Sequence, residues 1–259
     1  MRVLVCIKRV PAPGARINIT ADGLAVDTAF LGFTMSPHEE CAVEEAVQIV
    51  ERNGGTSTVL TLGPVEADEQ LRYAASLGVN EAILIPTDGL DWDAQRTATA
   101  IASAISAAEE TGGDFDVILF GNESADSGGF QVGIRVAHKL ARPVVNGIKG
   151  IAFSTSADGA AITVAKRESD GGHEIYHVPM PAVLGVKEGI NLPRYPTMKG
   201  RLSSKKVVVV QHQSDAPAGG QHLVALQRPA EQASRTVVLG TGVEAAPAIV
   251  DLLTELGLV

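Results

Sequence analysis

DVILFGNESADSGGFQVG, residues 116–133, is the stretch that decides the fold. The run DVILF (116–120) is short and apolar, as is typical of a buried strand. A glycine-rich loop follows it, and helical periodicity then extends from about Phe130 to Leu140. Because a strand, a loop and a helix in this order make one βα unit, the stretch indicates a parallel sheet.

The same alternation runs through the chain that precedes this stretch. Apolar runs predict strands at 2–7, 57–62 and 81–85. Helical periodicity is found at Val43, Ala46, Val47 and Val50, in the segment that ends near Leu77, and at Ala94, Ala98, Ile101, Ile105 and Ala108, where Asp91 can serve as the helix cap. Since near-continuous apolar strands need cover on both faces, we predict a doubly wound α/β fold with a mostly parallel sheet.

The pattern changes after this α/β part. Two alternating segments flank Ser169–Gly172, whose Asp-Gly centre is typical of a tight turn, and they predict a hairpin over 161–179. The remaining expected elements are strands at 181–186 and 207–210, a polar linker over 211–235 and a short helix near 244–256. We therefore expect a nucleotide-binding domain over 1–210 and a C-terminal extension over 211–259, whose apolar helix needs a partner surface to pack on.

Composition and charge exclude several classes of protein. A formal net charge of −9 argues against general nucleic-acid binding. No apolar run approaches the roughly 18 residues that a membrane helix requires, so we expect a chain that is not membrane-embedded. Cys6 and Cys41 lie in apolar patterns, which is the usage of a reduced compartment, and a cytoplasmic location is expected.

One segment departs from this acidic character. Residues 191–206 contain no Asp or Glu and carry the cations Arg194, Lys199, Arg201, Lys205 and Lys206. Taken alone, the segment is either a docking surface for another protein or a solvated connection between two strands.

A ligand site is expected where the parallel strands end. Residues Cys6–Arg9, Thr61–Pro64 and Gly121–Gly133 converge at that edge. Glycines and a helix N-terminus favour a phosphate there, although ordinary turn geometry explains them equally well. The spacing from Gly128 to Gly133 is similar to the front of a P-loop, but the Lys-Ser/Thr pair is missing.

Groups that would carry catalysis are scarce. The six histidines have no metal-ligand spacing, and no GxSxG motif occurs. The acidic pairs Glu39-Glu40 and Glu44-Glu45 are expected to be solvated helix faces. The chain is interpreted as a nucleotide-holding and partner-binding module with no metal site and no catalytic constellation of its own.

The order of several motifs resembles the beta subunit of electron-transferring flavoproteins, most closely its actinobacterial members. The motifs are LVCIKRVP (4–11), MSPHEECAVEEAVQI (35–49), TLGP (61–64), LRYAASLGVNEAI (71–83), GNESADSGGFQVG (121–133), KRESDGG (166–172) and LPRYPTMKGRLSSKK (192–206). The resemblance covers nearly the whole chain and implies a Rossmann-like domain of adenine-nucleotide-binding type.

The resemblance also implies partners and cofactors. It implies an obligate heterodimer with an alpha subunit that holds most of the redox FAD, while this chain binds AMP. Electrons would pass from acyl-CoA or related dehydrogenases, as in fatty acid β-oxidation, to a membrane quinone oxidoreductase. The chain would then be an electron carrier subunit and no enzyme by itself.

Site residues are carried over by position. The AMP pocket would be lined by Cys6, Ser36, Leu62, Gly63, Gly121, Asp126, Gly129, Phe130, Gln131 and Val132. Asp126 would contact the ribose or adenine, and the backbone at 130–132 would hold the phosphate. His38 would approach the flavin, and Glu168 would meet the mobile flavin domain of the alpha subunit. Docking of a dehydrogenase would use Met198 as the apolar anchor, with Arg194, Tyr195, Lys199 and Arg201 around it.

Three alternatives stay open. A second FAD, as in the electron-bifurcating branch of the family, would occupy the AMP pocket. A stand-alone nucleotide sensor similar to universal stress proteins would need no partner subunit. An ATP-using ligase or hydrolase is disfavoured because the P-loop lysine is missing.

Overall fold

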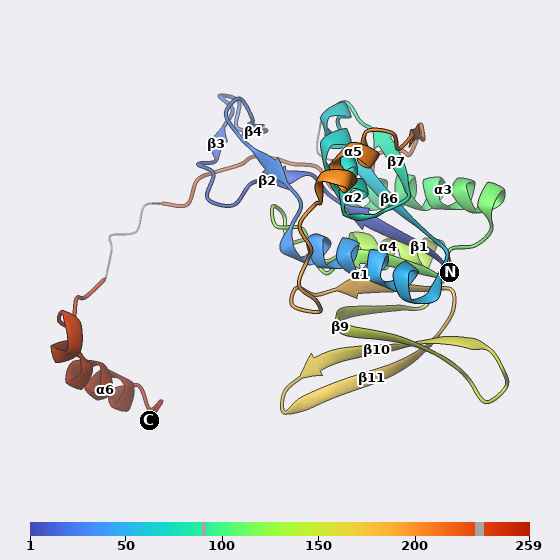
Figure 1. Cartoon of the computed structure of the whole chain (residues 1–259). Helices are drawn as coiled ribbons and strands as arrows, with labels where there is room; N and C mark the ends of the chain where they lie inside the picture. Colours follow the sequence, from blue (N-terminus) through green and yellow to red (C-terminus); the bar gives the residue numbers. More distant parts are fainter. Residues whose placement is uncertain (90–91, 231–235) are drawn as a thin grey trace.

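The computed structural model describes residues 1–89, 92–230 and 236–259 (Figure 1). Its centre is a nine-stranded sheet in the order β11-β10-β9-β12-β8-β1-β6-β7-β13. The strands are β1 (Arg2–Ile7), β6 (Thr56–Gly63), β7 (Glu81–Pro86), β8 (Val117–Gly121), β9 (Val144–Thr155), β10 (Ala161–Ser169), β11 (Gly172–Pro179), β12 (Ala182–Val186) and β13 (Val209–Gln211).

The sheet is mostly parallel and doubly wound, as predicted. In the spatial order β9-β12-β8-β1-β6-β7-β13, every pair of neighbouring strands is parallel. Strand β10 pairs antiparallel with both β9 and β11. Chain order runs from β1 through β6 to β7 on one side, and continues with β8 on the other side of β1. The winding therefore reverses between β1 and β8, as in a Rossmann-like fold.

Alternation along β1 explains why helices cover both faces. Val3, Val5 and Ile7 belong to one apolar core, and Leu4 and Cys6 to the other. The first core includes side chains of α1 (Pro37–Asn53) and α2 (Asp68–Leu77), and the second includes side chains of α3 (Ala94–Gly112) and α4 (Val132–Lys139). Both faces of the strand are buried, so its sequence is apolar throughout.

The start of α1 combines several helix signals. Ser36 caps the helix, Pro37 occupies its first turn, and Glu39 completes a capping box with Ser36. Helix α3 is capped by Asp93, whose side chain accepts from the amides of Gln95 and Arg96. The predicted cap Asp91 lies outside the described residues.

Strand β9 was not predicted from the sequence. Its run VVNGIKGIAFST is interrupted by Gly147, at φ 74°, and by Gly150, and most of its side chains are only half-buried. It therefore lacks the continuous apolar run of a central parallel strand. Helix α4 begins at Val132 and not at Phe130, because Phe130 has a left-handed φ of 53°.

The basic segment is partly helical, which its sequence did not predict. Helix α5 (Met198–Ser204) starts at Thr197, whose side chain accepts a hydrogen bond from the amide of Gly200. The strand predicted at 207–210 is displaced to β13. Packing of α5 on α2 explains the helix, because seven residues are too few for an isolated helix.

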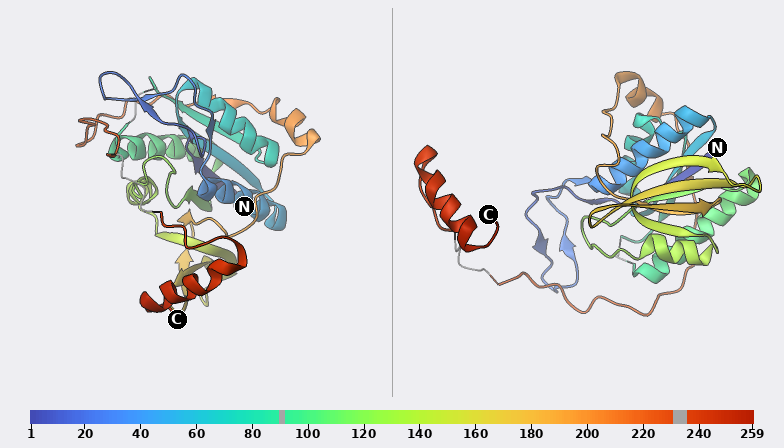
Figure 2. Two further views of the ribbon diagram at one scale, coloured as in Figure 1. Left: turned by 90° about the vertical axis from the view of Figure 1, so that its left-hand side faces the viewer. Right: turned by 90° about the horizontal axis from the view of Figure 1, so that it is seen from below.

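Shorter elements complete the chain. They are β2 (Val10–Pro11), β3 (Asn18–Ile19), β4 (Val26–Asp27), β5 (Phe33–Thr34), η1 (Val65–Ala67), η2 (Gly242–Ala245) and α6 (Ala246–Glu255). Helix α6 lies clear of the sheet in Figure 1 and in the right-hand view of Figure 2, and none of residues 246–255 is buried. Among the described residues, no helix has the length and apolar character needed to cross a membrane.

Candidate functional site

The carboxyl ends of β8, β1 and β6 lie side by side, as predicted. Cys6 in β1 is in register with Leu60 of β6 and Phe120 of β8. The Thr61 hydroxyl donates to the Ile7 carbonyl over 2.9 Å, which joins the C-terminal ends of β6 and β1. The winding reverses at this edge, so it is where an open α/β sheet places a ligand.

The loop after β8 is held by an ion pair that joins it to β1. Lys8 Nζ lies 2.5 Å from Asp126 Oδ2. Burial acts to raise the pKa of Asp126, but the Lys8 ammonium and hydrogen bonds from Ser124 and Ser127 outweigh it and hold the pKa below its usual value. Asp126 is therefore a fixed carboxylate at the strand ends.

The rest of this loop offers backbone amides. Gly128 and Phe130 both have positive φ, at 54° and 53°. Gln131 occupies the N-cap position of α4 and, among the described residues, makes no side-chain cap. A turn with left-handed residues followed by an uncapped helix start is an arrangement that suits an anion.

Helix α1 supplies the second wall of the site. The amide of Glu188 donates to His38 Nδ1 over 2.8 Å, so His38 Nε2 carries the proton that faces Glu123 Oε1 at 3.2 Å. The Ser36 hydroxyl donates to the Glu123 carbonyl over 3.3 Å. The first turn of α1 is thereby joined to the loop after β8 and to the segment after β12.

Gly121 allows the close approach of this turn to β8. A Cβ at Gly121 would lie 2.6 Å from Glu39 Cγ and 3.2 Å from the Glu39 amide nitrogen. The Glu39 carboxyl is buried and accepts from the Ser36 amide over 3.0 Å. Burial raises the pKa of Glu39 to about 8, although hydrogen bonds from Ser36 and Lys8 act to lower it.

Three further predicted pocket residues, Cys6, Leu62 and Gly63, lie on the buried side of the strand ends. The Cys6 thiol is in the core beneath α3 and α4, where burial and then the nearby Glu39 raise its pKa. Leu62 packs against the same core, and Gly63 would place a Cβ 3.3 Å from Ala67. These three residues form the apolar base of the site at the strand ends. The polar groups of the site come from Lys8 and from residues 36–39 and 121–131.

The expectation of solvated glutamates on α1 was wrong. Glu39, Glu44 and Glu45 are buried, at 5%, 2% and 4% exposure, and Glu40 is half-buried. Glu39 is compensated locally by Ser36, whereas Glu44 and Glu45 have partners that lie 150 and 146 residues away in the chain. Burial of such carboxylates costs free energy unless hydrogen bonds or cations compensate it.

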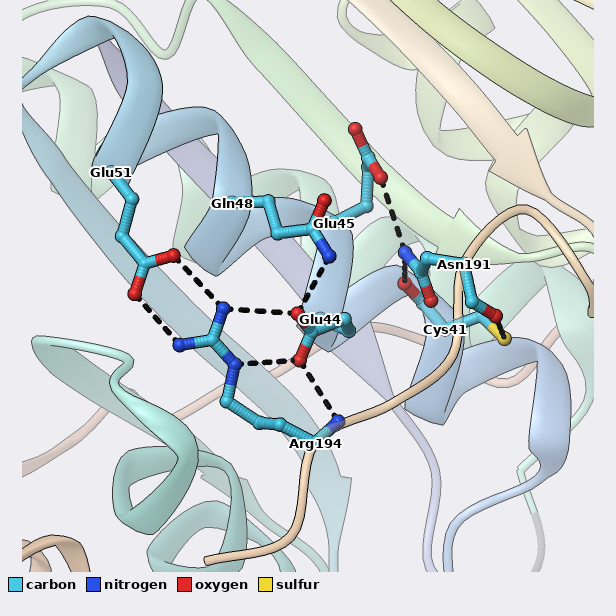
Figure 3. A network of polar contacts seen from close by, with 7 residues as sticks. All are labelled: Cys41, Glu44, Glu45, Gln48, Glu51, Asn191 and Arg194. Carbon is cyan, nitrogen blue, oxygen red and sulfur yellow. Dashed lines mark hydrogen bonds and ion pairs between the residues drawn. The ribbon is translucent and has the colours of Figure 1, made fainter.

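Arg194 is the main partner of Glu44 (Figure 3). Its guanidinium donates to both oxygens of Glu44, over 2.9 and 3.0 Å, and to both oxygens of Glu51, over 2.7 and 2.9 Å. Hydrogen bonds to Glu51 and Glu44 raise the pKa of Arg194. Burial acts to raise the pKa of Glu44, but the bonds from Arg194 and Gln48 outweigh it and lower the pKa.

A second pair of contacts completes this attachment. Asn191 Nδ2 donates to the Cys41 carbonyl over 3.0 Å and to Glu45 Oε2 over 3.1 Å, and Arg52 donates to Glu45 over 2.7 Å. The charge of Arg194 is therefore used within the chain. Of the residues predicted for docking, Arg194 fixes the segment to α1, and the others are left facing outward.

The outward-facing residues gather around the start of α5. Tyr195 is 90% exposed and Met198 is 76% exposed. Lys199 and Arg201 are exposed beside them. Glu168, predicted as a subunit contact, lies on β10 apart from this group, where a hydrogen bond from Lys149 lowers its pKa.

The surface has two hollows. One of about 670 Å³ is lined by η1, α2 and residues 207–211, and one of about 450 Å³ by the start of α1, Lys149 and residues 188–193. Neither includes the loop 121–131. Among the described residues, no cluster of His, Cys, Asp and Glu has the arrangement of a metal site.

The sheet order and the loop at its winding reversal define a Rossmann-like α/β protein with a candidate ligand site at the strand ends. The model of the electron transfer flavoprotein domain family matches residues 24–217. The chain is 32% identical over 252 residues to the electron transfer flavoprotein subunit beta of Mycobacterium leprae, covering 91% of both chains. It is 35% identical over 208 residues to the protein of the same name from Syntrophomonas wolfei, covering 80% of this chain and 77% of the relative.

Protein FixA of Rhizobium meliloti is 31% identical over 221 residues, covering 85% of this chain and 74% of FixA. The chain belongs to the electron transfer flavoprotein family. Membership confirms the resemblance inferred from the motifs and places the chain among proteins of flavin-linked electron transfer.

Sequence reasoning placed Lys8 and Glu123 at this edge only as members of the stretches Cys6–Arg9 and Gly121–Gly133, without a role for either, and it missed Glu39. Lys8 follows β1 directly, and its position at a strand end was the available signal. The Ser36-x-x-Glu39 spacing is that of a capping box, and it could have indicated that Glu39 bends back to the backbone.

We expect the buried Glu39 to make stability fall as the pH rises. The folded chain keeps the proton up to a pKa of about 8, whereas the unfolded chain releases it near the ordinary value of 4.5. Stability from this group is therefore lost between those two values. When the pH is raised from 5 to 8.5, the free energy of unfolding of Glu39→Gln should rise by about 1–3 kcal/mol relative to that of the native chain. Urea unfolding at both pH values measures this, and parallel pH profiles would contradict it.

Removing Arg194 should destabilise the fold because Glu44 would keep a buried charge without its cation. We expect Arg194→Met to lower the free energy of unfolding by about 1–3 kcal/mol, below the full cost of breaking a buried pair because Arg194 is partly exposed. Glu51→Gln, which alters only the exposed half of the network, is the control and should cost less than about 0.5 kcal/mol. Equal losses in the two variants would show that the burial of Glu44 is irrelevant.

Proposed function

We propose that this chain is the beta subunit of a heterodimeric electron transfer flavoprotein. It binds AMP at the strand ends and docks dehydrogenases through the segment around Met198. The FAD that it serves is held mainly by an alpha subunit and carries electrons from acyl-CoA-type dehydrogenases to a quinone oxidoreductase. The shared name of relatives that match over nine-tenths of both chains supports this assignment.

The structural observation that carries the proposal is that Met198 is exposed on a segment that is itself fixed to α1. Met198 is 76% exposed although Arg194, four residues earlier, is bound to two carboxylates of α1. A flexible, polarisable side chain suits a surface that receives several partners. Lys199 and Arg201 form a positive rim that favours a partner with an acidic surface around an apolar pocket.

AMP binding draws support from the loop after β8. Asp126 is held by Lys8 in a position to accept hydrogen bonds from a ribose, and the amides from Phe130 to Val132 precede and begin an uncapped helix. A phosphate at these amides gains from the helix dipole. Cys6, Ser36, Leu62, Gly63, Gly121 and Gly129 would provide the walls of the pocket.

The alpha subunit would meet two other parts of the chain. Helix α6 exposes Ile249, Val250 and Leu252, and Leu256 follows directly at its C-cap; a partner surface would cover these apolar side chains. His38 and Glu168 would face the flavin-bearing subunit. On this proposal residues 1–210 form the nucleotide-binding domain and 211–259 the extension that packs on the alpha subunit.

Co-expression with a neighbouring alpha-like gene tests the heterodimer and its cofactors. We expect a yellow complex from which acid extraction releases FAD and AMP in about equal amounts. Asp126→Ala should lower the AMP content severalfold without changing FAD, since a charged hydrogen-bond partner contributes about 1.5–3 kcal/mol. Asp170→Ala, in an exposed turn, is the matched control. Two FAD per complex would establish the bifurcating type, and absence of a flavin complex would reject the proposal.

Met198→Ala should slow electron transfer from an acyl-CoA dehydrogenase by about tenfold or more, because truncating a central anchor costs upward of 1.4 kcal/mol. FAD and AMP contents should not change. Val208→Ala is the control, since Val208 is also 76% exposed but lies beyond α5. Unaltered transfer from every dehydrogenase tested would reject the anchor role.

A further inference from the structure

Helix α5 depends on its surroundings for its conformation. It spans Met198–Ser204, which is too short for stable helix formation in water. Its position must therefore be set by the contacts that it makes with the rest of the chain. Those contacts are made with α2 and lie outside the basic segment itself.

Gly200 brings the backbone of α5 directly onto the last turn of α2. A Cβ at this position would lie 2.2 Å from the Ser76 carbonyl oxygen, a distance at which the helices could not keep their present separation. Ser76 is itself buried, and its hydroxyl donates to the Tyr73 carbonyl over 2.6 Å. The absence of a side chain at Gly200 thus fixes how closely α5 approaches α2.

Arg72 of α2 holds the other end of α5. Its Nη1 donates to the Ser204 carbonyl over 3.0 Å and to the Val207 carbonyl over 3.3 Å. Its Nε donates to Asp68 over 2.7 Å, which orients the guanidinium. Carbonyls at a helix C-terminus lack intrahelical partners, so Arg72 acts as their cap and also complements the helix dipole.

These contacts decide which side chains α5 presents. Met198 and Leu202 are four residues apart and lie on one helix face, and both are exposed. Thr197 caps the start of the helix, so side chains fix it at both ends. The anchor is therefore carried by a helix whose orientation is set before any partner arrives.

We propose that α2 is the platform that orients the docking surface, and that Arg72 and Gly200 are positioning residues for partner binding, with Leu202 as a second anchor beside Met198. The partner is a dehydrogenase with an apolar pocket and an acidic rim, so the proposal rests on the function proposed above. An anchor that is already ordered loses less conformational freedom on docking, and binding is correspondingly tighter.

The test measures docking separately from electron transfer. The flavin-loaded heterodimer is varied in concentration against an acyl-CoA dehydrogenase supplied with its acyl-CoA substrate. Arg72→Met and Gly200→Ala should each raise KM for the heterodimer by about three- to tenfold and leave kcat within about twofold. Arg72→Lys should recover part of the KM, because an ammonium can still donate to one carbonyl.

Three controls keep a structural effect apart from a docking effect. Gly172→Ala adds a Cβ where no described atom lies within 4 Å, and it should leave KM unchanged. FAD content and reduction of the flavin by dithionite should be the same in all variants. A lower melting temperature with unchanged KM in Arg72→Met and Gly200→Ala would show that these residues serve stability alone and would overturn the inference.

A combined variant tests whether Arg72 acts through the two anchors. KM for Met198→Ala with Leu202→Ala and Arg72→Met should be close to that for Met198→Ala with Leu202→Ala alone, and multiplication of the effects would overturn the positioning role. If Met198→Ala does not raise KM, the docking function itself is rejected. If Met198→Ala raises KM but Arg72→Met and Gly200→Ala do not, only the present inference is rejected.

Discussion

Helix α1 buries carboxylates, and the rest of the structure depends on how each of them is compensated. Glu39 keeps its proton near neutral pH and closes a capping box against the end of β8. Glu44 stays charged because Arg194 reaches it from a segment 150 residues away. The first arrangement attaches the helix to the sheet edge, and the second attaches the basic segment to the helix. Helix α1 therefore supports both the proposed nucleotide site and the proposed docking surface. The contacts that offset the cost of burying its carboxylates also hold these two surfaces in place.

The two surfaces differ in how they are built. At the strand ends the polar groups come from residues far apart in sequence that the parallel sheet brings into line, and Lys8 and Asp126 hold the loop. The proposed docking surface is instead a short helix fixed at its ends, with its apolar side chains turned outward. A rigid edge suits a nucleotide that stays bound. A small exposed anchor suits a partner that must leave after each electron transfer.

Local patterns were sufficient for part of this structure. Strands β1, β6, β7 and β8 were predictable because burial on both faces makes their sequences apolar throughout. Strand β9 was not, since glycines interrupt it, and α5 was not, since its stability comes from α2. The buried state of Glu44 depends on Arg194, and no periodicity along α1 records a partner so distant. For the same reason the edge of the sheet could be located from sequence, but the pairing of Lys8 with Asp126 could not.

The position of β1 in the sheet has a consequence for synthesis. Its neighbours are β6 and β8, and all of α2, β7 and α3 lie between those two strands in the chain. At about 5–20 residues per second, translation leaves one edge of β1 unpaired for on the order of several seconds after β6 has emerged. An open apolar strand edge can pair with another nascent chain during that interval. The winding reversal that creates the candidate ligand edge thus also sets the period in which this strand edge of the growing polypeptide is open to pairing with another chain.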